Sequence, residues 1–246
     1  MNLDVLFDAS AKSKDMAPDS ITIRRPDDWH IHLRDGAMLQ AVLPFTAGQF
    51  ARGIVMPNLV PPVTTIEAAE SYRSRILAAR PAGSDFQPLM TCYLTDDTSA
   101  NEIENGHARG AWIAAKLYPA GATTNSHYGV KNLKAIRAVL ERMERIGMPV
   151  LIHGEATDPA VDIFDRESVF MQDTLLPLLE EYQGLKVVIE HVTTEETVGI
   201  VRAHAPRVAG TGRRSGTDAA RWGSSRRTQG GLQSSPAPRN FACRRP

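Results

Sequence analysis

The chain has 246 residues, of which 42% are hydrophobic and 23% are charged, and it contains two cysteines, Cys92 and Cys243. These values are typical of a globular protein, and no apolar run approaches the roughly 20 residues that span a bilayer. Two cysteines without metal-binding spacing exclude a disulfide framework and a zinc finger. The first 15 residues lack the basic and apolar segments of a signal peptide, so we expect a cytoplasmic protein.

The formal net charge of zero conceals two parts of opposite charge. Residues 205–246 contain nine arginines, no lysine and one acid, Asp218, which gives a charge of +8. Because the whole chain contains 28 basic and 28 acidic residues, the other 204 residues contain 19 bases and 27 acids. The change in charge predicts a change of organisation near residue 205.

Between these ends, short β-rich runs alternate with helical patterns. The predicted strands are 21–33, 51–59, 86–94, 111–119, 148–155 and 186–192, and residues 207–211 begin a seventh. The predicted helices are 64–80, 132–147, 167–184 and 193–205; the second ends on Gly147, and the last opens with the capping-box pattern Thr193-x-x-Glu196. Strand–helix alternation predicts a parallel sheet with crossover helices.

The fold class that follows is α/β. A glycine-rich nucleotide loop does not follow the first strand, which favours a (β/α)8 barrel of the TIM type over a Rossmann sheet. Seven strands are too few, so the barrel is expected to lack its last strands. We divide the chain into an N-terminal extension (1–20), an incomplete barrel (21–211) and a basic tail (212–246).

The tail has lost the apolar periodicity of the barrel. Of the 42 residues from 205 onward, 33 are Arg, Gly, Ala, Pro, Ser or Thr. This composition is typical of a disordered segment, and two origins are open. The tail is either a purposeful basic extension or, as we favour, an out-of-frame translation of a GC-rich gene.

The motif "DDWHIHLRDG" at residues 27–36 contains the first chemical signal. In a strand, residues i and i+2 point to the same face, so His30, His32 and Arg34 are expected to project together. Two such imidazoles at the carboxyl end of a barrel strand can bind one divalent metal. Taken alone, the pair is more typical of two surface or hydrogen-bonded histidines.

Other predicted strands end on polar residues as well. His153 ends "PVLIH", His191 ends "KVVIEH" and Lys116 ends "AWIAAK". The carboxyl ends of barrel strands meet on one rim, where active sites of such barrels lie. A buried lysine there can be a Schiff-base nucleophile, an ion-pair partner or, as a carbamate, a metal ligand.

Taken together, the motifs resemble those of dihydroorotases of the shorter bacterial type, within the amidohydrolase superfamily. The resemblance rests on "DDWHIHLRD", "MPN" (56–58), "KLYPAGATTNS" (116–126), "HGE" (153–155) and "EHVTT" (190–194), and it covers residues 20–211. It implies a zinc-dependent cyclic amidohydrolase that interconverts N-carbamoyl-L-aspartate and (S)-dihydroorotate in pyrimidine (UMP) biosynthesis, by attack of a metal-bridging hydroxide.

The resemblance also implies ligands and partners. His30 and His32 bind one zinc ion, His153 and His191 bind a second, and Lys116, as N6-carboxylysine, bridges the two. The substrate is a small molecule, the intact family is a homodimer, and neither nucleic acid nor a membrane is an expected partner.

Substrate binding is assigned by the same resemblance to Arg34 and Asn58, with contributions from His32, His153, Thr123 and Thr124. Simpler readings stay open for several of these residues. Arg34 can be an ion-pair partner of Asp28 or Asp35, Asn58 a turn residue, and the threonines merely polar loop residues. We interpret Asp27 and Asp28 as strand-flanking acids, with Asp28 available to orient a histidine.

The catalytic aspartate that the family carries after its eighth strand has no counterpart here, so no catalytic residue is assigned. Asp218 lies in "SGTDAAR", without a strand before it. General acid–base catalysis contributes about 10²- to 10⁴-fold, so we expect poor turnover, and open sheet edges predict poor solubility. Two other readings are a carboxylated-lysine enzyme such as a hydantoinase, and a non-catalytic remnant that binds metal or a partner.

Overall fold

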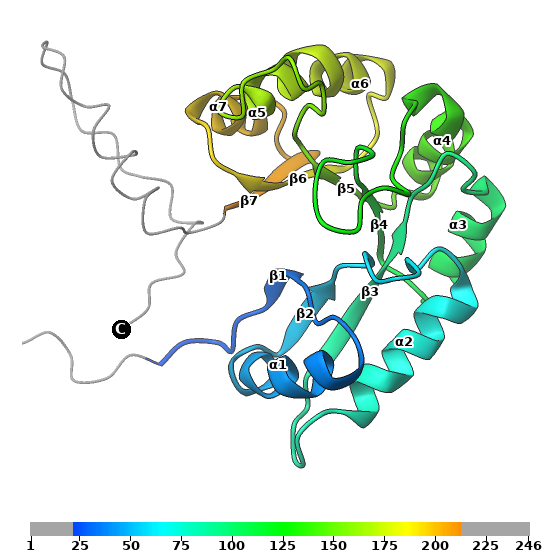
Figure 1. Ribbon diagram of the computed structural model, residues 1–246, viewed down its shortest axis with the longest axis vertical. Coiled ribbons are helices and arrows are strands. Elements are labelled where there is room, and N and C mark those ends of the chain that lie inside the picture. The colour runs from blue at the N-terminus through cyan, green and yellow to red at the C-terminus, as the bar shows by residue number, and fades with distance from the viewer. Residues whose placement is uncertain (1–21, 213–246) are drawn as a thin grey trace, which may run out of the picture.

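The computed structural model describes residues 22–212, and seven strands in this range form one sheet. The strands follow one another in chain order, and every neighbouring pair is parallel. They are β1 (Asp28–Ile31), β2 (Arg52–Val55), β3 (Gln87–Tyr93), β4 (Ala114–Leu117), β5 (Val150–His153), β6 (Val187–Val192) and β7 (Val208–Gly212). Within residues 22–212, β7 does not pair with β1, so the barrel is nearly closed but open along one line (Figure 1).

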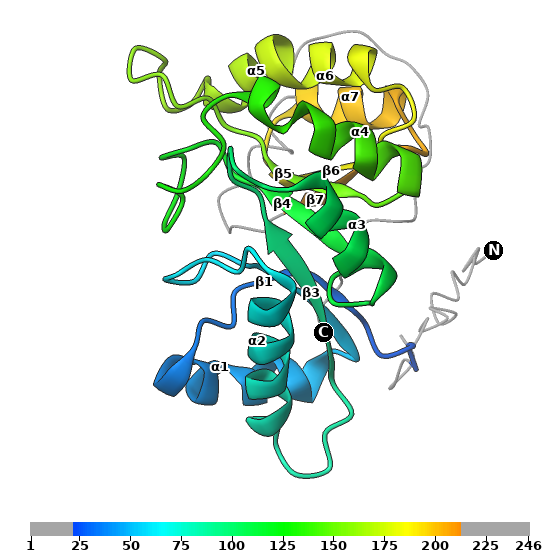
Figure 2. The ribbon, with the colours of Figure 1, turned by 90° about the vertical axis from the view of Figure 1, so that its right-hand side faces the viewer.

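Helices lie on the outer side of the strands in both views (Figures 1 and 2). They are α1 (Gly36–Gln49), α2 (Ile66–Ala78), α3 (Ala100–Ala108), α4 (Arg137–Ile146), α5 (Arg166–Phe170), α6 (Leu176–Glu181) and α7 (Glu195–Ala203). A 3₁₀ turn, η1 (Leu133–Ile136), precedes α4, and a π-helical turn, η2 (Met171–Leu175), joins α5 to α6. This arrangement confirms the predicted barrel of alternating strands and helices.

The core has an outer and an inner part because side chains alternate along each strand. The outer part fills the space between sheet and helices and includes Leu43, Tyr72 and Met143, none of which has exposed surface. The inner part is smaller and is made by buried Ile54, Met56, Ala114 and Leu151. Polar side chains occupy the inner positions nearer the carboxyl ends of the strands.

Most predicted elements occur, with shorter bounds. The first strand was predicted over 21–33 but is confined to Asp28–Ile31, and the helix predicted over 167–184 is divided by the π-helical turn. Two helices, α1 and α3, were missed. The first contains Pro44, and the second contains Gly106, where a Cβ atom would lie 2.2 Å from the Trp112 ring. Both residues disfavour helix in isolation and are tolerated because of packing.

The capping-box prediction at α7 is wrong by one residue. The N-cap is Thr194, whose side chain accepts a hydrogen bond from the Thr197 amide. Thr193 instead donates its hydroxyl proton to Glu167. By contrast, Gly147 closes α4 in the left-handed conformation, with φ 69°, as the sequence predicts.

No helix among the described residues is long and apolar enough to cross a membrane. The predicted N-terminal extension and basic tail fall almost entirely outside the described residues. Both therefore stay predictions. The strand expected to begin at 207–211 is present as β7.

Candidate active site

The two histidines of the first motif lie side by side at the end of β1. The Nε2 atoms of His30 and His32 are 3.1 Å apart, whereas Ile31 between them packs against the outer core and Trp29 before them is 52% exposed. On the other side of the His32 ring, Nδ1 lies 2.9 Å from Oδ1 of Asn58, and this contact fixes the orientation of the ring. The alternation of the strand therefore places both rings on the inner side of the barrel.

The histidines at the ends of β5 and β6 join this pair. The ring centroids of His153 and His191 are 4.5 Å apart, and those of His30 and His191 are 5.5 Å apart. Strands β1, β5 and β6 thus bring four imidazoles into one cluster. The structure places these four residues together, as the sequence predicts.

His191 reaches the cluster through an unusual backbone conformation. It has φ 47°, and the pairing of β6 with β7 shifts register between Ile189 and Val192. Arg34 and Asn125, the other two non-glycine residues with positive φ among residues 22–212, lie at the same end of the barrel. Such conformations cost about 1–3 kcal/mol and concentrate at functional sites, so their clustering supports a functional role for this rim.

Lys116 is buried inside the barrel and is paired with Glu190. Neither side chain has exposed surface, and Nζ of Lys116 donates to Oε2 of Glu190. The other carboxylate oxygen, Oε1, lies 2.9 Å from Nδ1 of His30. Burial lowers the pKa of Lys116 well below its usual range, so the loss of the Nζ proton that carboxylation requires is easier here than at a surface lysine.

Glu190 was not predicted as a site residue, although the sequence carries a signal for it. It is the single charged residue within the apolar strand run "VVIEHV" and lies two positions after Val188, which packs against the inner core. Its position on the inner face follows from the alternation of the strand.

Asn58 connects the first motif to the loop after β4. It is only 2% exposed, and its amide nitrogen donates to the Thr124 carbonyl at 3.0 Å. Since Nδ2 is thus the donor, Oδ1 is the acceptor that faces His32. Asn58 is therefore not a turn residue that satisfies its own backbone. Asn125, which the sequence reading missed, donates to the Asn58 carbonyl at 3.1 Å.

Arg34 does not pair with either neighbouring aspartate. Its guanidinium lies 3.4 Å from the Asn58 carbonyl, and its own carbonyl accepts from the Tyr72 hydroxyl at 2.6 Å. Asp35 binds Arg75 instead, and Asp28 accepts from the His30 main-chain amide. The ion-pair reading of Arg34 is wrong, and its half-buried guanidinium remains available to a ligand.

The two threonines of the β4 loop have exposed side chains. Thr124 reaches the site through its main-chain carbonyl, and Thr123 forms main-chain contacts with Ser126. Asp27 lies away from the site, where it accepts two hydrogen bonds from Arg52. None of these contacts supplies a side-chain donor to the histidine cluster.

The electrostatics keep His32 neutral. Burial, followed by the positive charges of His30 and Arg34, lowers the pKa of His32 to about 3. At His153, Nε2 lies 3.1 Å from Oε2 of Glu155, and this contact lowers the pKa of Glu155. Neutral imidazoles are the form that binds metals.

The donor atoms of the first pair fit a zinc ion. With Zn–N bonds of about 2.0–2.1 Å and a tetrahedral angle, two nitrogens on one zinc lie about 3.3 Å apart. The two Nε2 atoms are at 3.1 Å, close to this separation. Among residues 22–212, no three His, Cys, Asp or Glu side chains are arranged to hold a metal ion, so the His30–His32 pair is the fitting part of the donor set.

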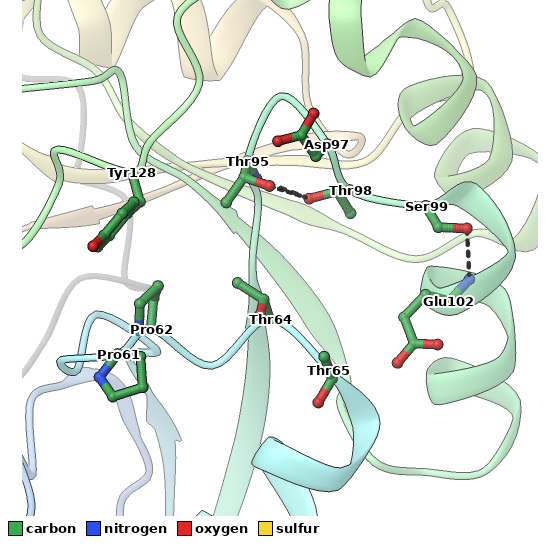
Figure 3. Close-up of a pocket in the computed structure, with 10 residues that line it drawn as sticks. All are labelled: Pro61, Pro62, Thr64, Thr65, Thr95, Asp97, Thr98, Ser99, Glu102 and Tyr128. Atoms are coloured by element: carbon green, nitrogen blue, oxygen red, sulfur yellow. Dashed lines mark hydrogen bonds between the residues drawn. The ribbon is translucent and has the colours of Figure 1, made fainter.

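A separate pocket of about 580 Å³ lies among the loops that follow β2, β3 and β4 (Figure 3). Hydroxyl side chains, two prolines, Tyr128, Asp97 and Glu102 line it. None of the four clustered histidines does. The pocket therefore does not define the candidate active site.

Comparison with known families identifies the lineage of this barrel. The model of the amidohydrolase family matches residues 25–221, which is most of the chain. The chain belongs to the amidohydrolase family. Within this family, the histidine cluster and Lys116 lie at the strand ends where barrel active sites are built.

Curated relatives of this amidohydrolase include dihydroorotases. One from Synechococcus sp. (strain RCC307) is 60% identical over 195 residues, which cover 79% of this chain and 56% of the relative. One from Sphingopyxis alaskensis is 61% identical over 193 residues, covering 78% of this chain and 57% of the relative. The chain thus spans a little over half the length of the relatives it matches.

Solved structures agree with the assignment. The dihydroorotase from Campylobacter jejuni superposes with a TM-score of 0.71 at 33% identity, covering 77% of this chain and 54% of that one. Dihydroorotase from Saccharomyces cerevisiae, solved with 5-fluoroorotic acid, gives 0.69 at 28% identity over 76% of this chain and 55% of that one. An L-hydantoinase from Arthrobacter aurescens shares the fold, with 0.62 at 17% identity, over 81% of this chain and 50% of that one.

Proposed function

We propose that this amidohydrolase barrel is built for dihydroorotase chemistry, the interconversion of N-carbamoyl-L-aspartate and (S)-dihydroorotate in pyrimidine biosynthesis. The observation that carries the proposal is the convergence of four histidines and buried Lys116 beside Arg34, in a chain about 60% identical to dihydroorotases. The substrate carries a carboxylate, and the positively charged guanidinium of Arg34 lies at the edge of the site.

The substrate carboxylate is assigned to Arg34. Its guanidinium presents paired donors that match a carboxylate, and the Tyr72 hydroxyl fixes its backbone at 2.6 Å. Asn58 connects the end of β1 to the loop after β4, because its side chain contacts both His32 and the Thr124 carbonyl. Thr123 and Thr124 lie in the same loop with exposed side chains, and we assign them to the substrate when that loop closes over it.

Zinc is the metal that this donor set suits, with His30 and His32 as ligands of one ion, His153 and His191 as ligands of a second, and carboxylated Lys116 between them. Bound zinc would supply Lewis acidity toward the ring amide carbonyl and lower the pKa of a water nucleophile. Burial of Lys116 supports its modification, because only a neutral amine adds CO₂.

We propose further that turnover by this chain is impaired. The family's catalytic aspartate has no counterpart in "GRRSGTDAARWGSS" or the residues that follow. The resemblance also supports a cytoplasmic homodimer for intact members of the family. A hydantoinase is less consistent with the site, since Arg34 suits an acidic substrate.

Two measurements on the full chain test this proposal. Zinc content per chain is expected to approach two after loading with zinc and bicarbonate, and the double variant His30→Asn/His32→Asn is expected to lose about half of it. Dihydroorotate hydrolysis is followed by loss of ring absorbance. Bound zinc with slow hydrolysis of dihydroorotate, and none of hydantoin, supports the proposal.

The remaining outcomes separate the alternatives. Zinc binding without any turnover favours a non-catalytic metal-binding remnant. Hydrolysis of hydantoin in preference to dihydroorotate favours a hydantoinase. A folded protein that binds no zinc contradicts the proposal.

A further inference from the structure

The turn that follows β6 is held by a carboxylate from another element. Glu167, in the first turn of α5, accepts hydrogen bonds from the main-chain amides and the hydroxyls of both Thr193 and Thr194. Its Oε2 atom lies 3.0 Å from the Thr193 amide nitrogen, and its Oε1 atom lies 3.1 Å from the Thr194 amide nitrogen. Because hydrogen bonds to a carboxylate are stronger than those between neutral groups, this contact fixes two consecutive residues.

His191 precedes this turn and has an unusual backbone conformation. Its φ is 47°, and the pairing of β6 with β7 shifts register between Ile189 and Val192. A non-glycine residue keeps a left-handed backbone only where the surrounding structure fixes it. Contacts close to His191 therefore have to supply that restraint.

The restraints act on His191 itself and on the residues after it. The His191 amide donates to the hydroxyl oxygen of Thr211 on β7 at 2.9 Å. Glu167 fixes the chain two and three residues further on, where Thr194 also caps α7. Helix α5 lies beside α7 and contacts it (Figure 1). The carboxylate thus anchors the end of β6 to α5.

The start of α5 is also attached to the chain that follows β5. The Ala156 amide, three residues after His153, donates to the carbonyl oxygen of Arg166 at 3.0 Å. Arg166 is the neighbour of Glu167 in α5. One turn of this helix therefore binds the segments that follow both His153 and His191, whose ring centroids are 4.5 Å apart.

We propose that Glu167 is the positioning residue for His191: its carboxylate holds the turn at Thr193 and Thr194, and so keeps the His191 imidazole beside that of His153. The threonines of "EHVTT" are the donors through which α5 holds the strand end. The consequence for zinc rests on the proposed function, in which these two histidines bind the second ion. The conformation of His191 does not, because the contacts that fix it are made in the metal-free protein.

Glu167→Ala tests the proposal through amide hydrogen exchange, resolved by NMR in the metal-free full chain. The His191 amide is bonded to Thr211 and not to Glu167, so faster exchange there reports a change transmitted along the turn. We expect its exchange, relative to amides of the central strands β4 and β5, to accelerate about 10-fold or more, since a hydrogen bond to a charged group shifts a local opening equilibrium by about this much.

Glu144→Ala is the matched control. Glu144 on α4 also accepts from a main-chain amide, that of Gly184, which precedes β6 at the opposite end of the strand. This variant is expected to leave the relative exchange of the His191 amide within about twofold of the parent, because it has no contact with the turn after β6. An equal acceleration in both variants would overturn the proposal.

Zinc affinity supplies a readout that a purely structural role would not move selectively. In the His30→Asn/His32→Asn background, the remaining zinc is the one assigned to His153 and His191. Adding Glu167→Ala is expected to weaken its binding about 10- to 100-fold, the usual effect of losing a residue that orients a metal ligand, measured by competition with a chromophoric chelator.

The reciprocal background completes this test. In His153→Asn/His191→Asn, only the zinc assigned to the other pair remains, and Glu167→Ala is expected to change its affinity by no more than about twofold. Equal losses in the two backgrounds would show a general loss of structure and would overturn the proposal.

The exchange measurement separates this inference from the proposed function. If the parent binds no zinc but Glu167→Ala accelerates exchange at His191, the proposed function fails and the positioning role stands. Parent-like exchange at His191 in folded Glu167→Ala refutes the positioning role, whatever the zinc content. If Glu167→Ala does not fold, Glu167→Asp keeps the charge but withdraws the carboxylate from the turn by one methylene, and the same acceleration is expected; its absence refutes the role equally.

Discussion

Two ion pairs show how differently the inside and the outside of this barrel are built. Lys116 and Glu190 pair inside, where neither side chain has exposed surface, whereas Arg137 and Glu141 pair on α4 with side chains 66% and 54% exposed. The outer pair loses little hydration when it forms, and it contributes little to the free energy of unfolding. The inner pair must offset the cost of removing two charges from water.

The surroundings differ in the same way. Between sheet and helices, apolar side chains pack without exposed surface, and this layer accounts for most of the core. The inner end of the barrel holds imidazoles, an amine and a carboxylate instead. Apolar residues of similar volume would stabilise the barrel at least as well, so retention of buried charge points to chemistry rather than stability.

The largest expected effect comes from breaking the inner pair. Lys116→Met leaves the Glu190 carboxylate buried beside an apolar side chain, so we expect the free energy of unfolding of the metal-free protein to fall by about 3–5 kcal/mol. Urea denaturation in the presence of a chelator measures it. Lys116→Met/Glu190→Leu removes both charges and is expected to recover most of the loss. A double variant as unstable as the single one would contradict this account.

A substitution that creates a cavity in the outer layer tests whether the free energy of unfolding and the zinc affinity are independent. Leu43 on α1 has no exposed surface, and Leu43→Ala is expected to cost about 3 kcal/mol through lost burial and an unfilled cavity. Zinc affinity is expected to stay within about twofold of the parent, since α1 contributes no candidate ligand. The same urea and chelator-competition measurements apply. A parallel loss of zinc affinity would show that the two layers are coupled.

The inner site also predicts a pH dependence. The pKa of His32 is about 3 in the folded protein against 6.5 as its ordinary value, mainly because of burial. The unfolded chain therefore takes up this proton first as the pH falls. Stability from neutral His32 is complete above pH 6.5 and is lost between 6.5 and 3.

The slope due to one such proton approaches about 1.4 kcal/mol per pH unit in the middle of that window. We expect His32→Gln in the metal-free protein to reduce the slope between about pH 6 and pH 4 by roughly 1 kcal/mol per unit, measured by urea denaturation at several pH values. Carboxylates contribute to both proteins and cancel in the difference. Equal slopes would show that His32 is protonated in the folded state.

Periodicity in the sequence predicted the strands and the polar residues at their ends. Elements that depend on tertiary packing were missed. Strand alternation placed His30 and His32 on one face, and the apolar runs before His153 and His191 located two further strand ends. Helices α1 and α3 were missed because Pro44 and Gly106 oppose local helix propensity, while tertiary contacts decide the outcome.

Within the site, the same division applies. Glu190 was missed because its importance depends on contacts with strands distant in sequence, β1 and β4. The positive φ of His191 lets consecutive residues of β6 both reach the interior, which strict alternation does not allow. Asn125 joins the network through its backbone conformation and an amide hydrogen bond, neither of which has a sequence pattern.

The smallest expected effect is at the outer ion pair. Glu141→Gln removes the carboxylate that accepts from Nε of Arg137 at 2.9 Å, but water solvates both side chains, and Glu181 lies 3.8 Å from the same guanidinium nitrogen. We expect a urea midpoint indistinguishable from that of the parent at physiological ionic strength, because exposed pairs are screened and readily replaced by hydration. A loss comparable to that of Lys116→Met would mean that exposure does not govern the cost of breaking these pairs. With no loss here and a large one inside, removing one charge from an ion pair would destabilise the protein only where the pair is buried.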